Sequence, residues 1–344
     1  MAVYRWRWLC AYQTQKILKR YRFISIFFVC SIFFSCRQTP VNTKYYWTAP
    51  DTLEIPNSAL GKEIRYGREL VVNTSRYFGP DGSISIYSGG MNCQNCHLEA
   101  GTKFWGNNFS AAFSTYPKYK DRRGEYESVT QKVMDCFERS LNVLLSTDHK
   151  QSAPDSNSRE IKAIVAYISW LGKNVPRGVK PEGAQTRDLP LLDHRADTAY
   201  GRQIFYLKCI SCHQKNGLGV KNPDKPGYQY PPLWGKQSYN TGASMYRLSR
   251  LAAFIQDNMP FGATYEQPQL NNEEAWDIAA FICSQPREIM DCSKDWPDPG
   301  TKFADIAFGP YADTFSYGQH KYGPFGPIEL WRKNYKKNSQ PAKQ

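Results

Sequence analysis

The apolar residues between positions 158 and 171 recur with the period of an α-helix. Their offsets are i, i+3, i+4, i+7 and i+10, so they share one face: Ile161, Ile164, Val165, Ile168 and Leu171. In the other half of the chain, residues 273–283 are apolar on most sides, follow possible N-caps at Asn271 and Asn272, and stop before Pro286. The pattern therefore predicts one buried helix in each half.

Each of these helices has an expected partner earlier in its own half. Residues 199–208 form a short amphipathic segment, in which Gly201 lets another helix approach closely and Phe205 fills the gap beside it. A matching helix is expected to begin at Gly67, and residues 128–142 are also expected to be helical. These elements predict a mainly α fold with two similar domains and long loops.

Two apolar segments do not fit this helical plan. Residues 23–34 form an apolar run, interrupted by Ser25 and Ser31, after a basic stretch; this is typical of an export signal and short for a membrane span. Residues 293–331 are rich in aromatic residues between Gly and Pro, with neither a helical nor a strand period. We expect this second segment to be an irregular strap packed over the domains.

The patterns divide the 344 residues into five parts. They are a signal peptide at 1–36, a first domain at 45–175, a linker rich in Pro, Gly and charge at 176–190, a second domain at 191–290, and an aromatic-rich extension with a basic end at 291–344.

Cys36 directly follows the apolar run and resembles the cleavage site of a lipoprotein signal, where it would become the lipidated first residue. Phe33 and Phe34 depart from the usual small-residue pattern, so ordinary cleavage and an uncleaved anchor remain alternatives. We expect an exported protein, periplasmic or anchored as a lipoprotein facing the periplasm, that contacts the membrane only through its lipid.

The excess of positive charge is confined to the two ends of the chain. Of 44 basic residues, six lie in residues 1–35 and five in 331–344, which leaves 33 against 31 acidic residues in the body. A body this close to neutral argues against a nucleic-acid-binding surface.

Two CxxCH motifs occur among the ten cysteines, at residues 93–97 and 209–213. In this motif the two thiols add to the vinyl groups of a haem, and the histidine is placed beneath the iron. A zinc site would need further Cys or His ligands nearby, and the other histidines are isolated. We therefore expect two covalently bound haems c. The expected attachment and ligand residues are Cys93, Cys96, His97, Cys209, Cys212 and His213.

The second haem is expected to have a methionine as its other axial ligand. Met259 precedes Pro260 in a loop and is favoured over Met245, which lies in a stretch of helical character. In cytochromes that this half resembles, a carbonyl of a proline segment such as 230–235 accepts the proton of the haem histidine and fixes its ring. A thioether ligand raises the reduction potential, which suits an electron acceptor.

The first half has no such Met-Pro pair. Its expected helix at 128–142 offers Met134 and Cys136 as possible ligands, and Arg139 shares a face with Cys136. Cys283 and Cys292 lie nine apart, and whether they form a disulfide depends on their geometry.

These residues resemble the thiosulfate dehydrogenase family of dihaem c-type cytochromes. Cys136, Arg139, Ser140 and Asn142 match the family's Cys-x-x-Arg-Ser-x-Asn stretch. Residues 119–122 resemble its Tyr-basic-x-Arg run, and residues 230–235, 238–240 and 258–260 extend the likeness into the second half. It covers about residues 60–330. Two departures are Val143, where the family usually has Gly, and Asn258, where some members have a Lys that exchanges with the Met ligand.

The resemblance implies that Cys136 is the second ligand of the first haem and takes part in catalysis. Two thiosulfate ions would be joined into tetrathionate, and electrons would pass from a His/Cys haem to a His/Met haem and on to an acceptor cytochrome or another redox protein. Binding of the dianionic substrate calls for cationic donors, for which Arg122 and Arg139 are the candidates, with Lys118, Lys120 and Lys132 nearby.

Other functions stay open at this point. The same site can run in reverse as a tetrathionate reductase. A non-catalytic electron carrier would be favoured by Met134 as ligand and by the lack of an anion pocket. A sulfur-carrier cytochrome also has a Cys-ligated haem but acts on a partner protein.

Overall fold

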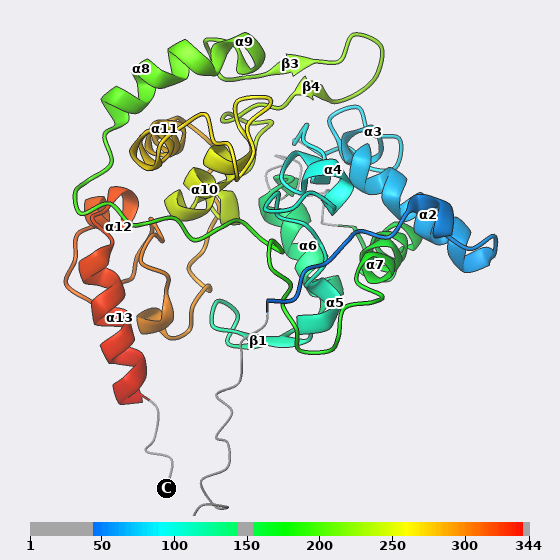
Figure 1. The fold of residues 1–344 in the computed structure, drawn as a ribbon, viewed down its shortest axis with the longest axis horizontal. Helices are drawn as coiled ribbons and strands as arrows, with labels where there is room; N and C mark the ends of the chain where they lie inside the picture. The colour runs from blue at the N-terminus through cyan, green and yellow to red at the C-terminus, as the bar shows by residue number, and fades with distance from the viewer. Residues whose placement is uncertain (1–43, 88, 144–153, 340–344) are drawn as a thin grey trace, which may run out of the picture. The chain divides into compact units, whose positions relative to one another are not determined.

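The computed structural model describes residues 44–87, 89–143 and 154–339 (Figure 1). All elements below lie in the unit Tyr45–Gln344. The expected signal peptide and Cys36 lie outside the described residues. Within the described part, no helix is both long and apolar enough to cross a membrane.

The described part is mainly helical, as predicted. Its first half contains α2 (Ala59–Val72), α3 (Thr74–Phe78), α4 (Leu98–Gly101), α5 (Ala112–Thr115), α6 (Val129–Arg139) and α7 (Arg159–Leu171). Its second half contains α8 (Thr198–Lys208), α9 (Ile210–His213), α10 (Leu248–Asn258) and α11 (Asn272–Ser284). Single 3₁₀ turns lie at Thr52–Glu54, Cys93–Asn95, Ser244–Tyr246 and Pro299–Thr301.

The strands form two small antiparallel hairpins. In the first, β1 (Lys118–Lys120) pairs with β2 (Glu125–Glu127), so that Lys118 lies opposite Glu127. In the second, β3 (Val220–Lys221) pairs with β4 (Tyr228–Tyr230). Neither hairpin builds a core, since Glu127 is the only strand residue of the two hairpins that is buried.

A helix pair that crosses at a glycine recurs in both halves. A Cβ atom added to Gly67 of α2 would lie 1.9 Å from the carbonyl oxygen of Ala163 in α7. A Cβ at Gly201 of α8 would likewise lie 1.9 Å from the carbonyl oxygen of Asp277 in α11. Only glycine permits this approach, so the expected role of Gly201 is confirmed.

One helix boundary was predicted wrongly. The helix expected to begin at Gly67 begins at Ala59, where the Ser58 hydroxyl caps it by accepting from the Gly61 amide at 3.2 Å. The first two turns expose Leu60 and Lys62 and bury Gly61 and Ile64, so their apolar pattern is too weak to reveal the helix.

The C-terminal extension is less irregular than expected, because α12 (Tyr317–Tyr322) and α13 (Gly326–Ser339) are helices. Ile328, Trp331 and Tyr335 lie at i, i+3 and i+7 in α13, and the two rings stack at 5.1 Å. The fourth inward position is Arg332, which is 8% exposed. Because this buried position carries a charged residue, the helical period of the apolar residues was not apparent in the sequence.

The two cysteines at the end of the second half are free thiols. Cys283 is buried, with its sulfur 3.5 Å from the Tyr246 carbonyl oxygen. The sulfur of Cys292 lies 3.8 Å from Arg139 Nη1. The disulfide that the sequence left open does not form in this structure.

Candidate active site

The first CxxCH segment holds its histidine in one orientation. The His97 Nδ1–H group donates to the Asn107 carbonyl oxygen at 2.6 Å, and the ring stacks on Phe109 at 4.4 Å. Burial lowers the pKa of His97 to about 4, so the ring is neutral. Since Nδ1 is occupied, Nε2 is the nitrogen left for a metal.

The second CxxCH segment repeats this arrangement on α9. His213 Nδ1–H donates to the Pro231 carbonyl oxygen at 2.9 Å, and burial lowers the pKa of the imidazole. The predicted contact between the proline segment and the histidine is therefore confirmed.

The donor set fits haem better than zinc. The four CxxCH cysteines are free thiols, and each histidine has only one nitrogen engaged. In the part of the chain that the structure describes, no group of three or more His, Cys, Asp or Glu could hold a metal ion. Two thiols and one free imidazole nitrogen on a single turn are what covalent haem attachment needs.

Helix α6 brings Cys136 close to the first CxxCH segment. Ser128 and Gln131 form a capping box at its start, and Phe137 packs edge-on against Phe78 with ring centroids 5.2 Å apart. Burial raises the pKa of Cys93 to about 11 and that of Cys96 to about 12, and the charge of a Cys136 thiolate contributes to both shifts. The Cys136 sulfur is thus within electrostatic reach of both attachment cysteines.

Met134, the other possible ligand on α6, is partly buried against the hydrophobic core. Cys136 itself is held in an environment of mixed charge. Burial raises the pKa of its thiol, Lys132 and Arg139 lower it, and Asp135 and Glu127 raise it further. The net shift of the Cys136 pKa is upward, so Lys132 and Arg139 only partly offset the effect of burial. A bound metal would favour the thiolate, which is the nucleophilic and metal-binding form.

Three half-buried lysines on the β1–β2 hairpin and α6 form what we call the lysine cluster: Lys118, Lys120 and Lys132. Of these, Lys132 lowers the pKa of Cys136. The Nζ atoms of Lys118 and Lys120 lie 4.5 Å and 5.2 Å from the Tyr116 ring. Burial and the two neighbouring lysines lower the pKa of Lys120 to about 8. Mutual repulsion of this kind is relieved by a bound anion.

The lysine cluster is only partly neutralised. Lys120 Nζ lies 3.8 Å from the buried Glu127 carboxylate, while Lys118 and Lys132 have no carboxylate within 4.0 Å among the described residues. Asp135, the other nearby acid, pairs with Arg123 at 3.0 Å. The corner formed by the β1–β2 hairpin and α6 therefore carries net positive charge.

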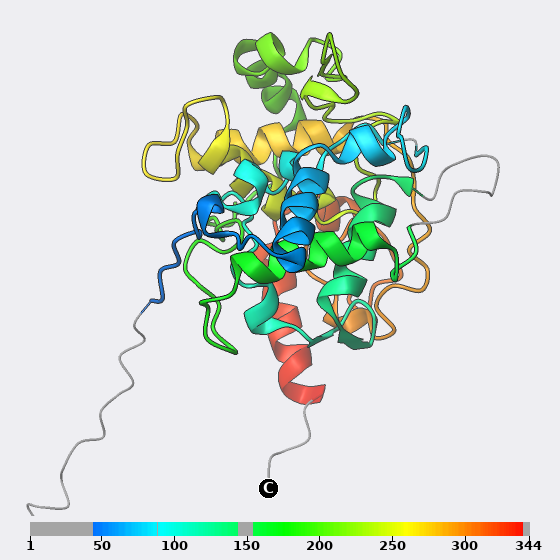
Figure 2. The same cartoon turned by 90° about the vertical axis from the view of Figure 1, so that its right-hand side faces the viewer.

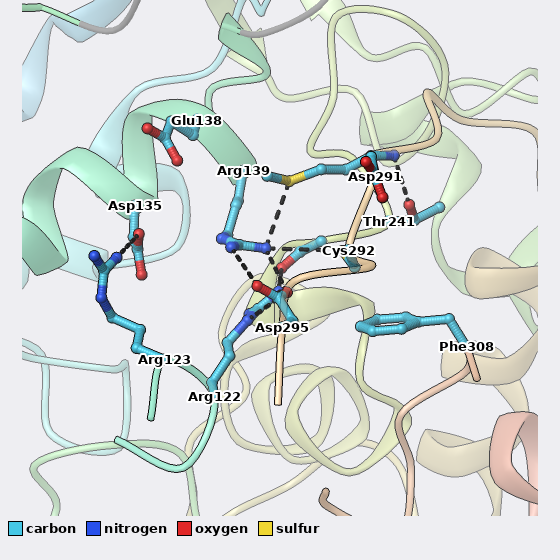
Figure 3. A network of polar contacts seen from close by, with 12 residues as sticks. Arg122, Arg123, Asp135, Glu138, Arg139, Thr241, Asp291, Cys292, Asp295 and Phe308 are labelled. Carbon is cyan, nitrogen blue, oxygen red and sulfur yellow. Dashed lines mark hydrogen bonds and ion pairs between the residues drawn. The ribbon is translucent and has the colours of Figure 1, made fainter. Parts of the chain in front are cut away.

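Arg122 and Arg139, the arginines expected to bind substrate, meet at a carboxylate (Figure 3). Arg122 donates to Asp295 at 2.6 Å and 2.9 Å, and Arg139 donates to both oxygens of Asp295 at 3.0 Å. Burial raises the pKa of Asp295, but the two guanidinium groups outweigh it and the net shift is downward. We call these three residues the Arg–Asp cluster; it keeps one uncompensated positive charge.

The C-terminal segment closes over the Arg–Asp cluster. The Trp296 amide donates to the Arg122 carbonyl oxygen at 2.8 Å, and the Arg122 guanidinium lies 4.9 Å from the centre of the Trp296 ring. Met290 and Cys292 place their sulfur atoms 3.5 Å and 3.8 Å from Arg139 Nη1. Sequence reasoning missed Asp295, which has no motif around it and lies 156 residues from Arg139.

The two methionines considered as ligands of the second haem lie in or against the hydrophobic core. Met259 directly follows α10 and packs, partly buried, against the core, while Met245 is 7% exposed within it. Asn258, which stands before the methionine, donates to the Trp105 carbonyl oxygen of the first half at 3.3 Å. This hydrogen bond joins the residue before Met259, the expected ligand, to the first half of the chain.

The chain is similar to a family model and to several named proteins. The cytochrome c family model matches residues 198–286. Proteins named thiosulfate dehydrogenase from Stutzerimonas stutzeri (strain A1501) and Allochromatium vinosum are each 34% identical, over 70% and 71% of this chain and 73% and 85% of their own lengths. A third, from Psychrobacter arcticus, is 34% identical over 72% of this chain and 71% of its own.

A solved structure is also similar. The chain described as thiosulfate dehydrogenase (TsdBA) from Marichromatium purpuratum, in its as-isolated form, aligns with a TM-score of 0.63 and 29% identity. The alignment covers 70% of this chain and 49% of that one, so the present chain spans about half of the solved chain.

Proposed function

Because the chain belongs to the thiosulfate dehydrogenase family of c-type cytochromes, we propose that it joins two thiosulfate ions into tetrathionate at Cys136. It is an oxidoreductase acting on thiosulfate and carries covalently bound haem c. The number of haems, their axial ligands and the catalytic residues are the proposed part.

Two haems are proposed, one in each half. Cys93, Cys96 and His97 would hold the first, with Cys136 as the opposite ligand. A second set would hold the other haem: Cys209, Cys212, His213 and Met259. When bound, the two haems supply two one-electron acceptors for a reaction that releases two electrons.

The proposal is supported by one relationship: Cys136 interacts electrostatically with both cysteines of the first CxxCH motif and with Lys132 of the lysine cluster. Thiosulfate has two negative charges and a nucleophilic sulfur, so it needs cations for binding and an oxidant nearby. The lysine cluster supplies charge-assisted donors at the same corner as the thiol. Arg139 and Arg122 add further positive charge, which the Asp295 carboxylate partly neutralises.

The reaction balances with Cys136 as a covalent participant. The Cys136 thiolate and one thiosulfate form an S–S bond, which gives a cysteine S-thiosulfonate and releases two electrons. The sulfane sulfur of a second thiosulfate then attacks the adduct sulfur that is bonded to Cys136 Sγ, so that the bond to Sγ breaks, tetrathionate leaves and the Cys136 thiolate is regenerated. No proton is taken up or released. The lysine cluster would hold the first anion while the second approaches.

The remaining parts of the proposal concern direction, partner and location. The same adduct formed from tetrathionate would run the reaction as a reduction, and the haem potentials decide which direction prevails. The electrons would leave through the second haem to a cytochrome or another redox protein. Export and lipidation at Cys36 complete the proposal and are tested by mass analysis of the mature N-terminus.

Thiosulfate-dependent reduction of the purified protein, followed in the visible spectrum, tests the function. We expect reduced haem bands on addition of thiosulfate and reoxidation by tetrathionate. Cys136→Ala should abolish turnover while both haems stay attached. An inert wild-type spectrum would instead favour a carrier, and sulfur transfer to a protein without tetrathionate formation would favour the sulfur-carrier alternative.

A further inference from the structure

The segment around the second CxxCH motif has an unusual charge balance. Residues 198–237 contain six basic side chains and one acidic side chain, whereas the body of the chain is nearly neutral. The acidic residue is Asp224; the basic ones are Arg202, Lys208, Lys215, Lys221, Lys225 and Lys236. This local excess is not explained by catalysis, which we place in the first half.

Three of these lysines are free to meet a partner. Lys215, Lys221 and Lys225 are exposed and have no carboxylate within 4.0 Å among the described residues, whereas Lys208 pairs with Glu274 at 3.7 Å. Lys215 follows the end of α9, Lys221 lies on β3, and Lys225 lies on the turn of the β3–β4 hairpin. These elements lie together at one end of the unit in both views (Figures 1 and 2).

Large apolar side chains are exposed in the same region. Leu207 and Leu218, on either side of the CxxCH motif, are 81% and 45% exposed, and Phe261 is 96% exposed. Phe261 is tied to the end of α8 through Gln269, which donates to the Phe261 carbonyl oxygen at 3.3 Å and accepts from Lys208 Nζ at 3.1 Å. Apolar residues with charged neighbours are typical of a protein-docking surface.

We propose that this outlet surface, formed by Leu207, Leu218 and Phe261 with Lys215, Lys221 and Lys225, docks a redox protein with an acidic surface. The inference rests on the second haem being the point where electrons leave. Each transfer oxidises one ferrous haem to ferric and reduces one acceptor centre by one electron, with no bond made or broken. Opposite charges would speed the encounter and orient the two redox centres.

The test uses acidic plastocyanin, a copper redox protein, as the probe acceptor. The protein is reduced with dithionite and freed of excess reductant, so that the result does not depend on thiosulfate turnover. Stopped-flow mixing then measures the second-order rate of cupric to cuprous conversion at 20 mM and 200 mM salt. We expect the wild-type rate to fall about tenfold or more between these salt concentrations.

Matched charge reversals locate the surface. The triple variant K215E/K221E/K225E should lose about tenfold or more in rate at low salt and should weaken binding between the two oxidised proteins in titration calorimetry. The control triple K62E/K162E/K294E changes the same charge on exposed lysines elsewhere and should change the rate less than about twofold. The spectrum and melting temperature of each variant report intact folding.

Three outcomes would overturn the proposal. An equal loss of rate in both triple variants would show that only the net charge of the protein matters. An unchanged rate in both would show that these lysines do not contribute to docking. Loss of binding to phosphatidylglycerol vesicles in K215E/K221E/K225E, with the plastocyanin rate unchanged, would make the surface a lipid contact. An inactive thiosulfate assay alone would count against the proposed function and leave this inference standing.

Discussion

Asn240 donates its side-chain amide to the Asn142 carboxamide oxygen at 3.1 Å and to the Glu138 carbonyl oxygen at 3.0 Å. Asn142 and Asn240 are fully buried and come from different halves of the chain. Asn142 has a φ of 57°, a left-handed conformation that asparagine tolerates better than most residues. The end of the helix that carries Cys136 is therefore fixed by the second half.

Replacing Asn240 with Ala should destabilise the protein by about 2–4 kcal/mol, because the Asn142 and Glu138 oxygens each lose one hydrogen bond in a largely buried setting. Chemical denaturation of the haem-loaded protein measures the change. Asn334→Ala, at an exposed position on α13, is the control and should change stability by less than about 0.5 kcal/mol. Similar losses in both variants would show that the contact between the halves contributes little.

The identity of the first haem's second ligand can be tested on α6. Cys136→Met keeps a sulfur ligand but removes the thiolate, so both haems should remain, the potential of the first haem should rise and turnover should vanish. Met134→Leu should leave spectrum, potential and turnover close to wild type. A changed haem spectrum in Met134→Leu alone would assign the ligand to Met134.

Lys120 gives a prediction for pH. Because its pKa is lowered to about 8, the cation proposed to bind thiosulfate is present below that pH and is lost as the pH rises through it. The KM for thiosulfate should therefore increase above about pH 8, with a smaller change in kcat. Lys120→Met should raise KM about tenfold at pH 7 and flatten this limb of the profile. Lys162→Met on α7 should reproduce the wild-type profile, and an unaltered KM in Lys120→Met would exclude Lys120 from binding.

The Arg–Asp cluster predicts acid sensitivity. The folded-state pKa of Asp295 is lowered, so its contribution to stability is present above the unfolded value of about 4 and is lost as the pH falls through the folded value. Asp295→Asn should cost about 2–4 kcal/mol at pH 7 and progressively less below pH 4. Asp188→Asn removes a carboxylate whose side chain is 93% exposed and 3.6 Å from Arg250; it should cost less than about 1 kcal/mol. A pH-independent loss in Asp295→Asn would contradict the charge-based account.

Met259→Leu should lower the potential of the second haem and leave the first unchanged, since a thioether ligand raises the potential. Met245→Leu should alter only stability. Potentiometric titration of each haem distinguishes the two variants. A change in the potential of the second haem in Met245→Leu alone would identify Met245 as the ligand.

The features that sequence revealed are those encoded over a few turns. The apolar face of α7 predicted its position to within one residue, because the helical period is local. The alternation of β1 would also have placed Lys118 and Lys120 on one face. The α13 helix was missed because its fourth inward position is a buried arginine that breaks the apolar pattern.

The candidate site was predictable only in part, for a related reason. The cysteines and histidines expected to bind haem lie within five-residue motifs, so spacing alone is enough to predict them. The carboxylate that joins Arg122 and Arg139 comes from a turn with no repeating pattern, and the contact joins residues 156 apart. Whether a cation is free or paired depends on such distant contacts, and local sequence does not report them.

The pairing of Arg139 with Asp295 also bears on the order in which the molecule is made. A chain is synthesised from its N-terminus, so both CxxCH motifs and the helix carrying Cys136 emerge before the segment that holds Asp295. Until that segment arrives, Arg122 and Arg139 face each other without a carboxylate. If haem binds the first CxxCH motif as proposed, it can attach before Arg122 and Arg139 are paired, and a chain truncated before residue 295 would lack the carboxylate that joins them.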